Sequence, residues 1–274
     1  MRRARRYLFF VGLFLFLIAC QRVASTPRLQ NETLACPVQY ELARIENGNA
    51  QQIIEHLAYT VSYNPTWKIP NWVAYSLTRE ETYGDVPREK RFSPDPMVKG
   101  ERVTHQDYTN SGYDRGHMAP AGDMKWSEQA MRESFYMSNI CPQNHNLNGG
   151  DWKALEELAR DWARKYDEVF IACGPIVYPG YSTIGNEHSI AVPSAFYKVF
   201  LRKTASSWAS IGFVFQNEPG HKPLLTYVAS VNEIEELTGI DFFYNLPDDI
   251  EEQVESDYDI SYWIVDRNTA LQKQ

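Results

Sequence analysis

Three polar motifs between Tyr113 and Glu156 decide the fold of this chain. They read Tyr113-Asp114-Arg115-Gly116-His117-Met118, then Ser138-Asn139-Ile140-Cys141-Pro142-Gln143, then Leu147-Asn148-Gly149-Gly150-Asp151-Trp152 with Leu155-Glu156 close behind. Several pieces have an ordinary interpretation when taken alone: Asp114–His117 as a turn with an internal salt bridge, Asn148–Gly150 as a glycine loop with positive φ, and Glu156 as part of a solvated helix face. Their occurrence together, in this order, favours a chemical site.

The side chains in these motifs suit the cleavage of a phosphodiester bond, which needs a base for water and a cation to stabilise charge on the phosphate. His117 is a natural base near neutral pH. Gly116 lets the backbone approach a neighbour closely, and Arg115 offers a fixed positive fork for phosphate oxygens. Asn148 is an oxygen ligand that would bind Mg²⁺ weakly and leave it largely hydrated. Glu156 could then accept hydrogen bonds from the metal-bound waters.

The rest of the chain predicts one α+β domain with a largely antiparallel sheet, because strands and helices do not alternate regularly. Alternating and apolar runs predict strands at 71–77, 168–173, 190–192, 196–202 and 208–215. Helical spacing and capping residues predict helices at 51–57, 128–137, from Asp151 onward, at 231–237 between Ser230 and Gly239, and at 248–255.

The N-terminus predicts export and lipid anchoring. Four arginines at positions 2, 3, 5 and 6 precede an apolar run from Tyr7 to Ala19, which is too short to span a membrane. The run ends in Leu17-Ile18-Ala19-Cys20, which resembles the bacterial lipobox, in which the cysteine is lipidated. An uncleaved anchor and an ordinary cleavage site are the alternatives. We therefore divide the chain into a signal peptide (1–19), a tether (20–45) and a folded domain (46–274), attached to a bacterial membrane through lipidated Cys20.

The charge and the cysteines add two constraints. Removing residues 1–19 takes away four arginines and changes the net charge from −8 to −12, which is unfavourable for binding a polyanion. A local basic groove would resolve this conflict, and seven cationic residues do lie between positions 79 and 115: Arg79, Arg88, Lys90, Arg91, Lys99, Arg102 and Arg115. Cys36, Cys141 and Cys173 show no metal-like spacing; a disulfide is permitted but not required, and Cys173 is predicted to lie in the core.

Over roughly residues 70–255 the sequence resembles the DNA/RNA non-specific endonucleases, a family that includes secreted bacterial nucleases and mitochondrial endonuclease G. The three motifs carry the resemblance together with further segments in the same order. These are Asn71–Tyr75, Pro87–Pro96, Val192–Val199, Val231–Gly239 and Leu246–Asp249.

The resemblance implies a ββα-metal finger that holds one Mg²⁺, for which Mn²⁺ can substitute. It implies that His117 is the general base, Asn148 the direct metal ligand, and Glu156 the acceptor for the metal's water shell. Asn139 would orient the site, while Arg115 and an upstream arginine would stabilise the phosphate. We assign that upstream role to Arg88, with Arg91 as the alternative.

The function expected from the resemblance is sequence-independent hydrolysis of DNA and RNA that leaves a 5′-phosphate. The acidic net charge supports a second hypothesis, in which a catalytically silent nuclease fold serves as an envelope binding module for glycans or a partner protein. Whether a protein inhibitor acts on the chain is left open by the sequence.

Overall fold

The computed structural model describes residues 38–46 and 48–265. The predicted signal peptide, Cys20 and Cys36 lie outside these residues. Within them, no helix is both long enough and apolar enough to cross a membrane.

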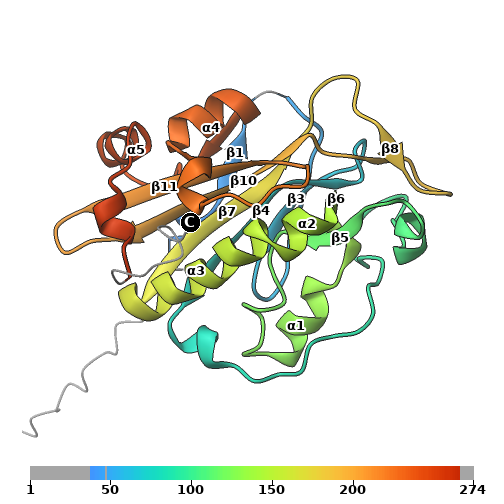
Figure 1. The fold of residues 1–274 in the computed structure, drawn as a ribbon, viewed down its shortest axis with the longest axis horizontal. Coiled ribbons are helices and arrows are strands. Elements are labelled where there is room, and N and C mark those ends of the chain that lie inside the picture. The colour runs from blue at the N-terminus through green and yellow to red at the C-terminus, as the bar shows by residue number, and fades with distance from the viewer. Residues whose placement is uncertain (1–37, 47, 266–274) are drawn as a thin grey trace, which may run out of the picture. The chain divides into compact units, whose positions relative to one another are not determined.

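A seven-stranded sheet forms the centre of the domain, in the order β12-β11-β10-β7-β4-β3-β2 (Figure 1). Every neighbouring pair in it is antiparallel, which confirms the predicted fold class. The strands are β2 (Gln52–Glu55), β3 (Thr60–Asn64), β4 (Ile69–Thr78), β7 (Glu168–Ile176), β10 (Ala195–Lys203), β11 (Trp208–Gln216) and β12 (Val228–Ala229).

Both faces of this sheet are covered, so successive side chains along a strand point alternately into two apolar cores. In β10, Phe196 and Phe200 point to one core, while Tyr197 and Val199 point to the other. The first core packs against α3 (Asp151–Tyr166), and the second against α4 (Val231–Thr238) and α5 (Asp248–Glu255) (Figure 1).

Helices α3, α4 and α5 form where the sequence predicted, and α1 (Glu128–Ser134) begins at the predicted residue but ends before residue 137. Trp152, Leu155, Leu158 and Trp162 of α3 recur at helical spacing and are all buried. Ser230 and Glu233 make a capping box at the start of α4, and Gly239 ends that helix in the left-handed conformation with φ 64°. These local signals agree with the tertiary packing.

A small hairpin beside the first core carries the polar motifs. It consists of β5 (Asp114–His117) and β6 (Ile140–Gln143), with His117 opposite Ile140 and Asp114 opposite Gln143. Helix α1 (Glu128–Ser134) lies between these strands in the chain, and α2 (His145–Gly149) and α3 follow them. The two strands with α3 form the ββα unit that the family resemblance predicted.

Short elements complete the fold. They are β1 (Ala43–Ile45) paired with β13 (Ile240–Phe242), β8 (Thr183–Ile184) paired with β9 (Ile190–Ala191), and the 3₁₀ helices η1 (Glu80–Tyr83), η2 (His105–Tyr108), η3 (Met137–Asn139), η4 (Leu224–Tyr227) and η5 (Ile260–Trp263).

Two predictions differ from this structure. Residues 52–55 form strand β2, not part of a helix over 51–57, because they pair with β3 along their whole length. The predicted tether to residue 45 already contains β1, whose Ala43 is buried in the second core. The folded part therefore includes residues before position 46.

Candidate active site

His117 ends strand β5 in an almost closed aromatic pocket. Only 7% of the residue is exposed, and the rings of Phe92 and Phe135 lie 5.3 and 4.8 Å from the imidazole, centroid to centroid. Burial, with a smaller contribution from the Arg88 guanidinium, lowers the pKa of His117 to about 3. Its Nε2 atom has no hydrogen-bond partner among the described residues. His117 is therefore neutral at pH 7, and its Nε2 atom is not engaged by any described residue.

The backbone around His117 is fixed from both sides. Asn139 is fully buried; its Oδ1 accepts from Ala119 N at 2.9 Å, and its Nδ2 donates to the carbonyls of Ala119 and Ser134, each at 2.9 Å. Trp152 Nε1 donates to the His117 carbonyl at 3.3 Å. Asn139 thus orients the strand that carries the imidazole, through the backbone.

Gly116 is required by a close approach between the two hairpin strands. A Cβ atom at this position would lie 2.2 Å from Gln143 Oε1 and 2.6 Å from Gln143 Cβ. Any larger residue would push β5 away from β6 and displace the neighbouring His117.

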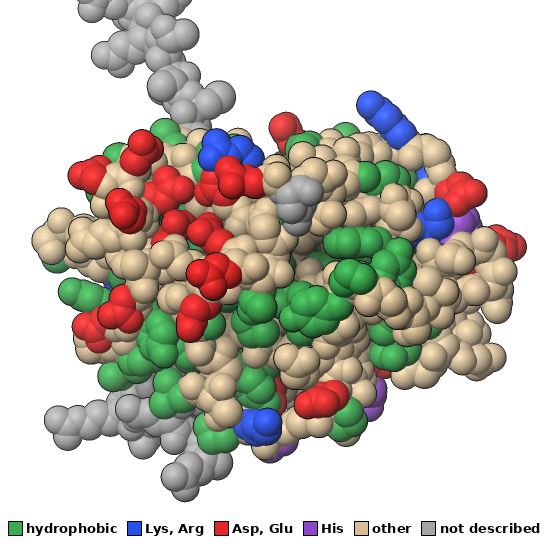
Figure 2. Space-filling model, turned by 90° about the horizontal axis from the view of Figure 1, so that it is seen from above, with side chains coloured by type: hydrophobic (Ala, Val, Ile, Leu, Met, Phe, Trp, Pro, Cys, Tyr) green, Lys and Arg blue, Asp and Glu red, His purple; other side chains and the backbone are tan. Residues whose placement is uncertain are grey.

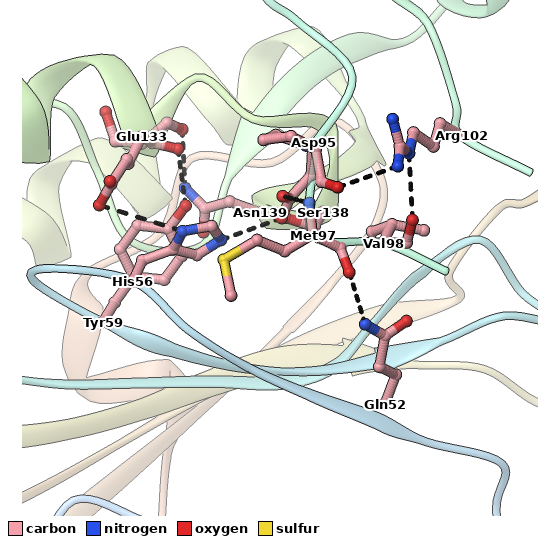
Figure 3. Close-up of polar contacts among 12 residues, drawn as sticks. Gln52, His56, Tyr59, Asp95, Met97, Val98, Arg102, Glu133, Ser138 and Asn139 are labelled. Atoms are coloured by element: carbon pink, nitrogen blue, oxygen red, sulfur yellow. Dashed lines mark hydrogen bonds and ion pairs between the residues drawn. The ribbon is translucent and has the colours of Figure 1, made fainter. Parts of the chain in front are cut away.

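The loop that carries Arg88 and Arg91 is held against the rest of the domain by a buried polar cluster around Asp95 (Figure 3). His56 Nε2 lies 2.9 Å from Asp95 Oδ2, and Ser138 Oγ donates to the same oxygen at 2.5 Å. On its other side His56 Nδ1 lies 4.0 Å from Glu133 of α1. The cluster therefore joins the residue after β2, the loop, α1 and the residue next to Asn139.

Of the two candidate upstream arginines, Arg88 lies within electrostatic reach of the site. Its guanidinium lies over the Phe135 ring at 5.0 Å, and its charge contributes to lowering the pKa of both His117 and Glu156. Arg91 is exposed and donates its backbone N–H to Glu89 at 3.1 Å.

Arg115 is held on strand β5 by several contacts. Its guanidinium lies 5.7 Å from the ring centres of Phe92 and Tyr108, and its Nη2 donates to the His105 carbonyl. Its Nε atom is buried without a hydrogen-bond partner in the described part of the chain.

Asn148 is oriented by a residue to which the sequence alone assigned no role. The Asn148 Nδ2 atom donates to Asp114 Oδ2 at 2.8 Å, and His145 Nδ1 lies 3.0 Å from the same oxygen. With its nitrogen engaged, Asn148 presents its amide oxygen as the free atom. The signal for this role of Asp114 was its place in the Asp114–His117 motif.

Glu156 lies one helical turn after Trp152 on α3 and is half-buried. Burial raises the pKa of Glu156 to about 7, while the nearby Lys198 ammonium acts in the opposite direction. No side chain or backbone group among the described residues hydrogen-bonds to its carboxyl group. The carboxyl oxygens are therefore free to accept hydrogen bonds from bound water.

The donor set fits a weakly held, hydrated divalent cation. Among residues 38–46 and 48–265, no group of three or more His, Cys, Asp or Glu side chains could hold a metal ion. The oriented amide oxygen of Asn148 and the free carboxyl of Glu156 instead match one direct oxygen ligand and an acceptor for its water shell.

With this geometry in place, comparison with known proteins shows the family. Residues 42–249 match the sequence model of the DNA/RNA non-specific endonucleases. The chain belongs to this family. The match covers all the predicted site residues, from Arg88 to Glu156.

Relatives in this family come from animals and fungi. The mitochondrial nuclease EXOG of Xenopus laevis is 38% identical over 73% of this chain and 60% of its own length. Mitochondrial endonuclease G of Homo sapiens is 33% identical over 75% and 74%, and nuclease C1 of Cunninghamella echinulata var. echinulata is 33% identical over 73% and 85%. The chain spans 56–60% of the length of the EXOG nucleases that it matches.

A solved structure supports the fold. The crystal structure of the EndoG/EndoGI complex superposes with a TM-score of 0.69 and 29% identity, covering 73% of this chain and 89% of the other. The ββα hairpin and helix described above belong to this nuclease fold.

Proposed function

We propose that this chain is an endonuclease that hydrolyses phosphodiester bonds of DNA and RNA without sequence preference. The observation that carries the proposal is the neutral, unpartnered and buried Nε2 of His117 next to the cationic Arg88. A binding module would have no need of a desolvated proton acceptor beside a phosphate-binding cation. Membership of the family and the nuclease names of the relatives support the same function.

In the proposed reaction His117 Nε2 removes a proton from a water molecule while the water oxygen forms a bond to phosphorus. The bond from phosphorus to the leaving oxygen breaks on the opposite side, and that oxygen takes up a proton from solvent. Arg88 and Arg115 stabilise the charge that develops on the phosphate oxygens. By family resemblance the product carries a 5′-phosphate.

Asn148 would hold Mg²⁺ through its amide oxygen, and Glu156 would accept hydrogen bonds from the waters of the ion. The ion, which Mn²⁺ can replace, would supply positive charge next to the scissile phosphate. Asp114 would orient Asn148, and Asn139 would orient His117.

A digestion assay tests the function. Plasmid DNA and a structured RNA are incubated with the purified domain, with Mg²⁺ or with chelator, and with Asn148→Ala as the metal-site variant. We expect both substrates to be degraded with Mg²⁺ and to survive in chelator. Asn148→Ala should lose most activity and recover part of it at high Mg²⁺ or Mn²⁺. An intact plasmid with well-folded wild-type protein would instead support the binding-module hypothesis.

We also propose that the protein is exported and attached to a bacterial membrane through lipidated Cys20, on the strength of the Leu17–Cys20 motif. Cys20→Ser should move the protein from the membrane fraction to the soluble fraction without changing catalysis. Mass spectrometry of the mature N-terminus checks this, and an unmodified cysteine or a cut at another site would refute it.

A further inference from the structure

A lysine is buried beneath the proposed active site with no partner for its charge. Lys198 lies in the middle of β10, on the same face as Phe196 and Phe200 and therefore toward α3. Its side chain is fully buried, and Nζ makes no hydrogen bond to any described residue. An unpaired buried ammonium costs several kcal/mol, so packing alone does not explain a lysine here.

The surroundings of this ammonium connect it to the site. Lys198 Nζ lies over the ring of Trp152, 4.4 Å from its centre. Glu156 lies four residues after Trp152 on α3 and so shares its helix face. After burial, which raises the pKa of Glu156, the Lys198 charge has the largest effect on that pKa, and it lowers it.

Other ionisable groups also act on Glu156, but none is an equivalent buried cation. Arg160 is paired with Asp123 at 2.7 Å, so the fields of these two groups largely cancel. Arg88 is exposed and is screened by solvent. The remaining groups, Tyr75 of β4 and Cys173 of β7, are neutral at pH 7 because burial raises their pKa values.

We propose that Lys198 is a positioning residue: its buried ammonium favours the ionised form of Glu156 in the metal-free protein, so that Mg²⁺ binding at neutral pH displaces fewer protons than it would without Lys198. This inference rests on the proposed function, in which Glu156 accepts hydrogen bonds from the water shell of the ion. Without Lys198, the buried Glu156 would carry a proton at pH 7 and would have to release it when Mg²⁺ binds.

The first test observes Glu156 directly in metal-free protein. Carboxyl-¹³C-labelled glutamate is titrated by NMR, and the Glu156 signal is identified by its loss in Glu156→Gln. Lys198→Met is expected to fold, because replacing a buried charge by an apolar side chain of similar volume is often neutral or stabilising. Lys198→Gln is the second variant. The matched control is Lys203→Met, at an exposed lysine on the same strand whose Nζ lies 5.1 Å from the Trp208 ring centre.

We expect the Glu156 midpoint near pH 7 in wild type and in Lys203→Met. Both Lys198 variants should shift it upward by about one pH unit or more. An unchanged midpoint in the Lys198 variants would overturn the proposal. The titration does not require nuclease activity. If the wild-type protein proved inactive, the proposed function would be wrong, but the titration would still show whether Lys198 affects Glu156.

The second test measures Mg²⁺ binding by calorimetry in buffers of different ionisation enthalpy. At pH 7 the Lys198 variants should bind Mg²⁺ at least about fivefold more weakly than wild type and release close to one proton per ion, against about half a proton for wild type. At pH 9 their affinity should equal or exceed that of wild type. A purely structural defect would persist at pH 9. Tighter binding at both pH values would mean that Lys198 only repels the ion, which contradicts the proposal.

Discussion

In the proposed mechanism His117 is the general base, and residues from elsewhere in the chain build its surroundings. We expect His117→Ala to lower the cleavage rate by about 10²–10⁴-fold, because no other histidine in the described structure has a buried ring nitrogen without a hydrogen-bond partner. Near-UV circular dichroism should show an unchanged fold. His105→Ala, which removes an exposed imidazole but keeps the carbonyl that Arg115 contacts, should retain wild-type activity. Cleavage at the wild-type rate by a folded His117→Ala protein would contradict the proposed mechanism.

The sequence predicted that His117 is the candidate base but not that it is buried and neutral. The Asp114–His117 motif and the spacing to Asn148 indicate a base and a metal ligand. The neutrality of His117 depends on Phe92, Phe135 and Arg88, which come from two other segments. In the same way, Lys198 lies in a strand whose pattern gives no sign of the helix that covers it. Such contacts require the tertiary fold.

At the scale of the elements, Asn139 joins the segment after β5 to the end of α1. Its carboxamide makes three hydrogen bonds to the backbone of Ala119 and Ser134. Asn139→Ala would leave three buried backbone groups without partners, and we expect it to destabilise the protein by about 3 kcal/mol. Urea unfolding checks this value. His117→Ala is the matched comparison, since it should lower activity without this destabilisation. If Asn139→Ala is inactive but as stable as wild type, Asn139 has a direct role in the reaction instead.

Local signals predicted those elements whose packing agrees with them. The caps of α4 and the periodicity of α3 are satisfied within a single segment, and both helices form as expected. The segment 51–57 has apolar residues at positions 53, 54 and 57, a spacing that also fits a helix turn. Pairing with β3 along all four residues of β2 outweighs that weak preference. The helix prediction for 51–57 is therefore wrong because pairing with a second strand, and not the local spacing of apolar residues, determines the structure here.

At the scale of the whole molecule, acidic side chains gather on the side of α4 and α5 (Figure 2). Burial and neighbouring carboxylates raise the pKa of Glu255 to about 9, and burial raises the pKa of Glu235 and Glu251 to about 7. One carboxyl oxygen of Glu255 is buried without a hydrogen-bond partner in the described part of the chain. The folded protein therefore binds protons here that the unfolded chain releases.

This cluster should make stability fall as pH rises. The contribution of Glu255 is fully present below its unfolded pKa of 4.5 and is lost as pH rises toward about 9. We expect Glu255→Gln to match wild type at pH 5 and to exceed it at pH 8 by on the order of 1–3 kcal/mol in unfolding free energy. Glu252→Gln, at an exposed position on the same helix, should show no such trend. Chemical denaturation at both pH values decides the matter; an equal difference at pH 5 and pH 8 would rule out this linkage.

The distribution of cations determines how an acidic protein can hold a polyanion. Two of the seven cationic residues predicted to form a groove are engaged elsewhere. Arg79 donates to the Arg164 carbonyl at 2.8 Å near the end of α3, and Arg102 donates to the carbonyls of Val98 and Pro96 at 3.0 and 2.9 Å. Of the remaining five, Arg88, Lys90 and Arg91 are exposed and neighbours in the chain, and the Arg88 charge acts on the site.

Few phosphate contacts predict a shallow dependence of binding on salt. Each neutralised phosphate contributes about −0.9 to the log–log slope on duplex DNA. Reversing Lys90 and Arg91 together to glutamate should weaken binding similarly for two unrelated DNA sequences and one RNA, because phosphate contacts carry no sequence information. It should also flatten the slope by about 0.9 for each phosphate that the variant no longer neutralises.

Binding is measured with His117→Ala as the background, so that cleavage does not interfere, and Lys203→Glu serves as the control for added negative charge. A steep slope that the double reversal leaves unchanged would place the binding surface elsewhere, and a strong preference for one sequence would contradict non-specific recognition.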